Sequence, residues 1–168
     1  GFIFVGEYLK RKGVRNLVEA HSYYIKRGGS ESCKFIGSGT LRISESDNQV
    51  NLGRLRKEVV LRHLLKASVF LLPSKDEVFG MAILEAMASG CICVASINEG
   101  FDGIIIDGYN GFLIEGCNTE SIIDVFERIS ELSYFEEQSI RNRAVSTASK
   151  LSIEIVADMY INSISVNV

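Results

Sequence analysis

The sequence predicts an α/β fold built on an open parallel sheet. Apolar strand-like runs alternate with stretches in which apolar residues recur at helical spacing. Glycines stand at many of the joins, since the chain has 15 glycines and only one proline. Strands separated by helices, with short glycine-rich connections, are typical of sheets that helices cover on both faces. A Rossmann-like, three-layer α/β/α domain is therefore expected.

Six short apolar runs account for the strands of this sheet. Each is bounded by glycine, proline or an Asx-Gly pair, which favour turns. The predicted strands are residues 1–5, 33–36, 49–52, 68–72, 91–95 and 112–114. The second and third are joined by a polar connection that is too short for a helix of typical length.

Helices are predicted where apolar residues fall three or four positions apart. The first helix has Val14, Leu17 and Ile25 on its apolar stripe and is stopped by Gly28 and Gly29. Asn118 or Thr119 can cap a later helix, whose inner face is Ile122, Val125, Phe126 and Ile129. The other predicted helices are residues 55–66, 81–89, 135–148 and a stretch from Ser152 onward.

The composition fits one globular domain. The 168 residues are 46% hydrophobic and 23% charged, and the longest apolar runs are far shorter than the roughly 20 residues of a membrane span. The net charge is −3 and neither sign forms a long block, which argues against nucleic acid as a partner. Because Gly1 lies inside a predicted strand, we expect residues 1–168 to be one domain of a longer protein.

The cysteines and histidines are predicted to be structural. None of the four cysteines has the C-x-x-C spacing of a zinc or thioredoxin site. Cys91 and Cys93 stand two residues apart in a predicted strand, so they face the same side and suit a core. Free cysteines fit a reducing, cytoplasmic location. His21 falls on an apolar helix stripe and His63 on a charged helix.

The most informative segment for function is residues 77–90. In parallel sheets a ligand binds beyond the carboxyl ends of the strands, and Glu77 follows a predicted strand at that edge. Gly80 allows close approach to the backbone, while Glu85 interrupts an apolar helix and needs polar partners, such as two sugar hydroxyls. The alternative is that Glu77 is a surface loop residue and Glu85 faces solvent. Spacing alone does not decide between them.

The order of motifs resembles the C-terminal, donor-binding domain of GT-B glycosyltransferases of the retaining family-4 type, the glycosyl transferases group 1. That family carries an E-x7-E motif, which Glu77 and Glu85 match. The resemblance covers nearly the whole chain, because other matching segments follow in the family's order. They are residues 2–6, 12–13, 35–42, 51–53, 67–74, 107–113 and 151–154. The resemblance implies one half of a GT-B fold.

The resemblance also implies roles for individual residues. Glu85 would hold the ribose hydroxyls of a nucleotide-sugar donor, and Glu77 would bind hydroxyls of the transferred sugar. Lys12 would neutralise the diphosphate leaving group as a point charge. Backbone amides of Phe79, Gly80 and Met81 would bind the sugar and diphosphate, and the base would lie near Gly53 and Arg54.

The activity implied is transfer of a sugar from a UDP- or GDP-sugar to an acceptor glycan or lipid-linked sugar, with retention of configuration. The family needs no tightly bound metal, so neither a metal nor another cofactor is expected. An acceptor-binding domain N-terminal to this chain would complete the enzyme, and the isolated domain would be nearly inactive. Many relatives build polysaccharides at the inner face of the cytoplasmic membrane.

Three departures from the family pattern leave other functions open, one of which is the short connection between residues 41 and 49. Glu7 stands where members usually have an arginine against the diphosphate, so either Lys10, Arg11 or Arg15 compensates or donor binding is weaker. Residues 101–103 replace the usual apolar residue, proline and glutamate. The alternatives are a degenerate, non-catalytic nucleotide-sugar-binding or interaction module, and a GT-B-type sugar epimerase that needs no acceptor.

Overall fold

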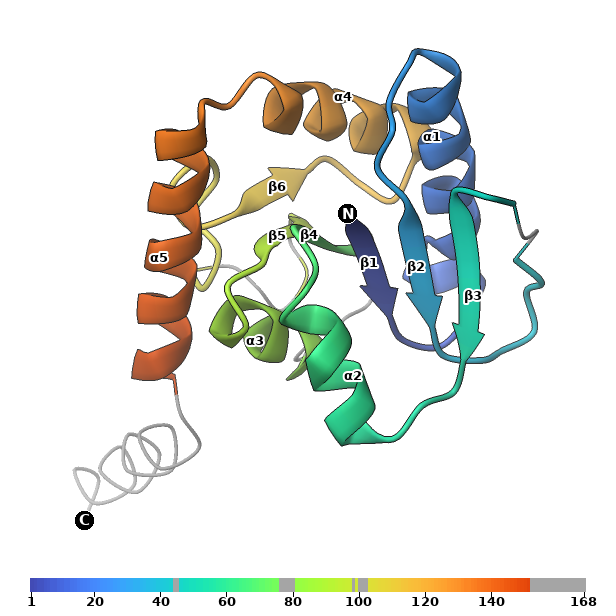
Figure 1. The fold of residues 1–168 in the computed structure, drawn as a ribbon, viewed down its shortest axis with the longest axis horizontal. Coiled ribbons are helices and arrows are strands. Elements are labelled where there is room, and N and C mark those ends of the chain that lie inside the picture. Colours follow the sequence, from blue (N-terminus) through green and yellow to red (C-terminus); the bar gives the residue numbers. More distant parts are fainter. Residues whose placement is uncertain (44–45, 76–80, 98, 100–102, 152–168) are drawn as a thin grey trace.

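A computed structural model describes residues 1–43, 46–75, 81–97, 99 and 103–151 of the chain. In this part of the chain six parallel strands form one sheet, in the order β3-β2-β1-β4-β5-β6 (Figure 1). The strands are β1 (Phe2–Val5), β2 (Cys33–Ile36), β3 (Gln49–Gly53), β4 (Val69–Leu72), β5 (Ile92–Ser96) and β6 (Phe112–Ile114). The predicted Rossmann-like α/β fold is confirmed.

Helices cover both faces of the sheet. They are the 3-10 turn η1 (Lys10–Lys12), α1 (Val14–Lys26), α2 (Lys57–Leu64), α3 (Met81–Ala88), α4 (Thr119–Ser130) and α5 (Tyr134–Lys150). Helices α1 and α4 pack together on one face, and α2 and α3 lie on the other, where α5 packs against α3 and β5 (Figure 1). None of the described helices is long and apolar enough to cross a membrane.

The ends of the elements follow local side-chain chemistry. The predicted cap at Asn118 is confirmed, because its Oδ1 accepts a hydrogen bond from the Ser121 amide at 2.8 Å. Ser133 and Glu136 form a reciprocal capping box at the start of α5. The six strands match their predicted positions within one residue, whereas the predicted helix from Ser152 onward lies outside the described residues.

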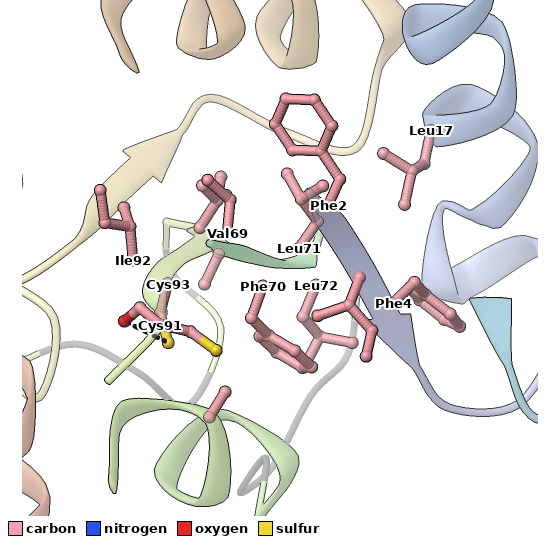
Figure 2. Packing of buried hydrophobic residues seen from close by; sticks show 14 of the residues in the cluster. Phe2, Phe4, Leu17, Val69, Phe70, Leu71, Leu72, Cys91, Ile92 and Cys93 are labelled. Atoms are coloured by element: carbon pink, nitrogen blue, oxygen red, sulfur yellow. Dashed lines mark hydrogen bonds between the residues drawn. The ribbon is translucent and has the colours of Figure 1, made fainter. Parts of the chain in front are cut away.

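The centre of the sheet is apolar on both sides. Every residue of β4 and β5 is buried, as expected for parallel strands under two helical layers. Figure 2 shows this cluster, with Cys91 and Cys93 among its members. Their thiols contact the carbonyl oxygens of Leu64 in α2 and Ile83 in α3, so both face the same layer, as predicted. Each fully buried large apolar side chain contributes roughly 1.5–3 kcal/mol.

Candidate functional site at the carboxyl edge

The strand order changes direction between β1 and β4. From β1 the sheet continues to β2 and β3, and from β4 it continues to β5 and β6 on the other side. The loops after β1 and β4 therefore diverge, and the crevice that they leave is where open α/β sheets bind ligands. Lys12 follows β1, and the helix that carries Glu85 follows β4.

The loop that carries Lys12 is fixed against the segment after β4. Gly13 has a φ of +67°, and a Cβ atom there would lie 2.2 Å from the carbonyl oxygen of Pro73. Only glycine allows both that conformation and that approach. The Lys75 amide also donates to the Arg11 carbonyl at 2.6 Å. Lys12, which is half-buried, is therefore held beside the end of β4.

Glu85 lies on α3 and forms an ion pair with the helix next to it. Its side chain is 24% exposed, and its Oε1 lies 2.9 Å from the Nζ of Lys57, which is 68% exposed. The hydrogen bond to Glu85, followed by the attraction of its charge, raises the pKa of Lys57. The expectation that Glu85 needs a polar partner is thus met by an ammonium group. Sequence reasoning missed Lys57, because nothing in the spacing links the start of α2 to α3.

The other half of the predicted E-x7-E site is only partly described. Met81 begins α3 and is 45% exposed. Glu77, Phe79 and Gly80 lie outside the described residues. Their implied contacts with the sugar and the diphosphate therefore stay predictions.

A cleft of about 290 Å³ opens beyond the ends of β1 and β2. This volume is close to the lower end of the roughly 300–1,000 Å³ that small-molecule sites occupy. Gly53, with a φ of +64°, turns the chain at the end of β3 just before Arg54. The cleft is lined by Val5, Gly6, Glu7, Ile36, Gly37, Ser38, Arg54, Leu55 and Val60. The structure therefore puts Arg54, one of the two residues implied for the base, on the wall of this cleft.

Two ion pairs engage basic residues that follow β1, one in the loop and one in α1. Glu7, where the resemblance implies an arginine, lies 3.6 Å from the guanidinium of Arg11. Arg15 pairs with Glu19 at 3.1 Å within α1. Of the three predicted compensating residues, Arg11 is the one that meets the Glu7 carboxylate. The negative charge of Glu7 is therefore partly balanced within the same loop.

Away from the crevice, the buried histidine makes the contacts of a structural residue. His21 is fully buried, and its Nε2 lies 2.9 Å from the Glu31 carbonyl oxygen, as a structural histidine requires. Among the residues that the structure describes, no three side chains of His, Cys, Asp or Glu are placed to share a metal ion.

Comparison with other sequences gives a consistent result. The model of the family "Glycosyl transferases group 1" matches residues 2–148. The alpha-D-kanosaminyltransferase of Streptomyces kanamyceticus is 26% identical over 168 residues, covering 93% of this chain and 43% of that protein. An uncharacterised glycosyltransferase of Methanocaldococcus jannaschii is 34% identical over 143 residues, or 80% of this chain and 38% of that protein. The chain thus spans about two fifths of the length of these relatives.

Solved structures share the fold. The C-terminal domain of a glycosyl transferase group 1 protein from Francisella tularensis has a TM-score of 0.78 at 21% identity, with 89% of this chain and 84% of that chain covered. A protein of Anabaena, HepE, solved in complex with UDP, has a TM-score of 0.82 at 17% identity, with 99% and 49% covered. The family model matches most of the chain, and the solved structures share its fold. The chain therefore belongs to the glycosyl transferases group 1 family, as one half of a GT-B fold.

Proposed function

We propose that this chain binds a nucleotide-sugar donor, a UDP- or GDP-sugar, and is the donor-binding half of a retaining glycosyltransferase. One observation carries the proposal: the segments that carry Lys12 and Arg54 and the helix that carries Glu85 follow β1, β3 and β4 at the carboxyl edge of one parallel sheet. HepE has been solved with UDP and with UDP-glucose, which supports a nucleotide donor. The proposal requires no metal or other cofactor.

The chemistry follows from the charge that develops during transfer. Breaking the bond between sugar and phosphate leaves negative charge on the departing diphosphate, which the Lys12 ammonium would stabilise. Fixed donors of this kind are worth roughly 3–4 kcal/mol each in comparable sites. Glu85 would accept hydrogen bonds from the ribose hydroxyls and Glu77 from the sugar. Backbone amides of Phe79, Gly80 and Met81 would donate to the sugar and diphosphate, with the base beside Gly53 and Arg54.

The acceptor would be bound outside this chain. Because the chain spans about two fifths of its relatives, we propose that the rest of the parent protein binds a glycan or a lipid-linked sugar. Polysaccharide synthesis at the inner face of the cytoplasmic membrane would suit such an acceptor. The isolated chain would bind the donor but transfer little sugar.

Calorimetric titration of the chain with UDP- and GDP-sugars tests the proposal. Glu85→Ala is expected to abolish binding and Lys12→Ala to weaken it. Glu120→Ala, which removes a carboxylate from the first turn of α4, serves as the matched control and should bind like the wild type. Wild-type protein that binds neither donor at millimolar concentration would contradict the proposal.

The second candidate is a non-catalytic module, and Glu7 is the observation that favours it. A carboxylate beside the diphosphate repels it, and Arg11 is already paired with that carboxylate at 3.6 Å. Such a module would bind a nucleotide sugar without assisting its cleavage. Assay of the full-length parent protein with donor and a glycan acceptor distinguishes the two, because the module would bind the donor and form no product.

A further inference from the structure

Tyr8 joins the loop after β1 to the connection after β2 and to strand β3. Its amide donates to the Ser38 carbonyl at 3.0 Å, and its own carbonyl accepts from the Leu41 amide at 3.0 Å. Its side chain points into the protein, where only 3% of the residue is exposed. There the hydroxyl donates to Oδ1 of Asn51 in β3, at 2.9 Å. One residue of the loop after β1 therefore contacts β3 across the connection that follows β2.

Asn51 in turn fixes the bend before Arg54. The same Oδ1 accepts a hydrogen bond from the Gly53 amide at 3.0 Å, an arrangement by which Asx side chains stabilise turns. Gly53 has a φ of +64°, which glycine tolerates best. Its carbonyl accepts from the Gly37 amide at 2.8 Å. Because Arg54 follows directly, its place on the cleft wall depends on this bend.

The donor and acceptor roles in this network are defined by its chemistry. A backbone amide and a protonated phenol are both donors, so the Asn51 atom that faces them is the carbonyl oxygen. Burial raises the pKa of the Tyr8 hydroxyl to about 12, so it stays protonated at neutral pH. A single oxygen is thus held by two donors, one from the loop after β1 and one from the bend after β3.

We infer that Tyr8 and Asn51 are positioning residues for the nucleoside end of the donor. They hold the bend that carries Arg54 in register with the loop that carries Lys12, and so set the distance between base and diphosphate. The inference rests on the proposed function and deepens it. Neither residue lines the cleft itself, so both act through the backbone that they fix.

The test compares nucleotide binding with pyrophosphate binding. Wild type, Tyr8→Phe, Asn51→Leu and the double variant are titrated with UDP, GDP and inorganic pyrophosphate. Loss of one hydrogen bond in the network should weaken binding of the preferred nucleotide about five- to tenfold. Pyrophosphate affinity should not change, because the Lys12 loop keeps its own contacts. The double variant should be no weaker than Asn51→Leu, because Asn51→Leu already removes the hydrogen bond that Tyr8→Phe removes, together with the one from the Gly53 amide.

Two further variants make the comparison specific. Asn51→Asp keeps an oxygen that both donors can reach, so it should restore nucleotide affinity. Tyr109→Phe removes a hydroxyl from a half-exposed tyrosine in the connection before β6 and should change nothing. Hydrogen exchange of the Gly53 amide gives a readout without ligand, and it should speed up in Tyr8→Phe.

Each outcome bears on the inference separately from the proposed function. If the wild type binds neither nucleotide, the proposed function is wrong and the inference falls with it. If the wild type binds one nucleotide, and Tyr8→Phe and Asn51→Leu bind that nucleotide as tightly as the wild type does, only the inference is overturned. Equal losses for nucleotide and pyrophosphate would show a merely structural role and also overturn it. An unchanged rate of hydrogen exchange at the Gly53 amide in Tyr8→Phe would also overturn the inference, even if that variant were less stable than the wild type.

Discussion

His21, near the amino edge of the sheet, and Glu85, near the carboxyl edge, are both polar residues in helices. His21 lies on the buried face of α1, and Glu85 interrupts the apolar sequence of α3. His21 is fully buried, with one ring nitrogen 2.9 Å from the Glu31 carbonyl oxygen and the other 3.2 Å from the Gln49 amide nitrogen. Glu85 is 24% exposed, and its partner Lys57 is 68% exposed. The contacts of His21 are therefore buried, whereas the ion pair of Glu85 is accessible to water.

This difference separates contacts that belong to the fold from contacts that a ligand could replace. The partners of His21 belong to the backbone and core, so no molecule from solution can replace them. The ammonium that meets Glu85 is hydrated, and ion pairs with exposed lysines are weak, so a ligand can displace it. We therefore expect substitutions at the amino edge to lower the free energy of unfolding, and substitutions at the carboxyl edge to lower donor affinity.

The largest expected effect is at the amino edge, where Phe126→Ala removes a ring from an aromatic cluster. The Phe126 ring lies 4.6 Å from that of Phe2 and 5.7 Å from that of Tyr24, between centroids. The free energy of unfolding should fall by about 3–5 kcal/mol, measured by urea denaturation. Phe135→Ala is the control, because Phe135 is 82% exposed. Reduced donor affinity in folded Phe126→Ala protein would break the distinction between the edges.

Glu85→Gln should show the opposite pattern. It keeps the shape of the side chain but removes the charge that strengthens hydrogen bonds to hydroxyls, so donor affinity should fall about ten- to a hundredfold. The urea midpoint should change little. Calorimetry and denaturation of the same sample measure both quantities, with Glu120→Gln as the control. If Glu85→Gln lowered stability and left affinity intact, Glu85 would belong with His21 as a structural residue.

Acid should affect the amino edge through His21. Burial lowers the pKa of His21, and the hydrogen bond to Glu31 offsets this only in part. As the pH falls through about 6.5, the ordinary value for histidine, the unfolded chain binds a proton that the folded protein does not. Stability is therefore complete above that pH and is lost below it, by up to about 1.4 kcal/mol per pH unit.

Urea midpoints at pH 7.5 and 5.5 check this expectation. His21→Gln should have lower urea midpoints than the wild type at both pH values. Its two midpoints should lie closer together than those of the wild type. His63 also has its pKa lowered, mainly by burial and then by the charges of Lys34 and Lys66. It is only half-buried, so His63→Gln should keep most of the pH dependence. Equal pH dependence in wild type and His21→Gln would assign the effect to other groups.

The fold was predictable because its signals are local. Periods of two and about 3.6 residues, with glycine, proline and Asn118 at the joins, give the strands and helices within a few residues. The 3-10 turn of Lys10–Lys12 was not predicted. Its three basic residues carry no apolar period, and the turn is stabilised by contacts with the segment after β4.

The site was predictable only where it resembles the family. Lys12 and Glu85 match family motifs, and the structure brings their segments to one edge of the sheet. The pairs of Glu85 with Lys57 and of Tyr8 with Asn51 join residues that are 28 and 43 positions apart. Neither spacing follows a period, so only the folded arrangement reveals these partners.

The smallest expected effect is at Glu7, and it tests whether the carboxyl edge is fully adapted to an anion. Glu7→Gln removes a negative charge beside the cleft and releases Arg11 from its ion pair. Pyrophosphate should bind about two- to fivefold more tightly, as expected for an exposed charge that water screens. The gain should shrink at high salt. Titration in 50 mM and 500 mM salt measures both.

Glu19→Gln is the matched control for Glu7, because Glu19 also pairs with an arginine, at 3.1 Å, but lies within α1 and does not line the cleft. It should leave pyrophosphate affinity unchanged. Weaker binding by Glu7→Gln would reverse the argument, because the carboxylate would then be holding Arg11 toward the ligand rather than away from it. Whether Glu7→Gln raises or lowers pyrophosphate affinity therefore decides whether the Glu7 carboxylate opposes donor binding or supports it.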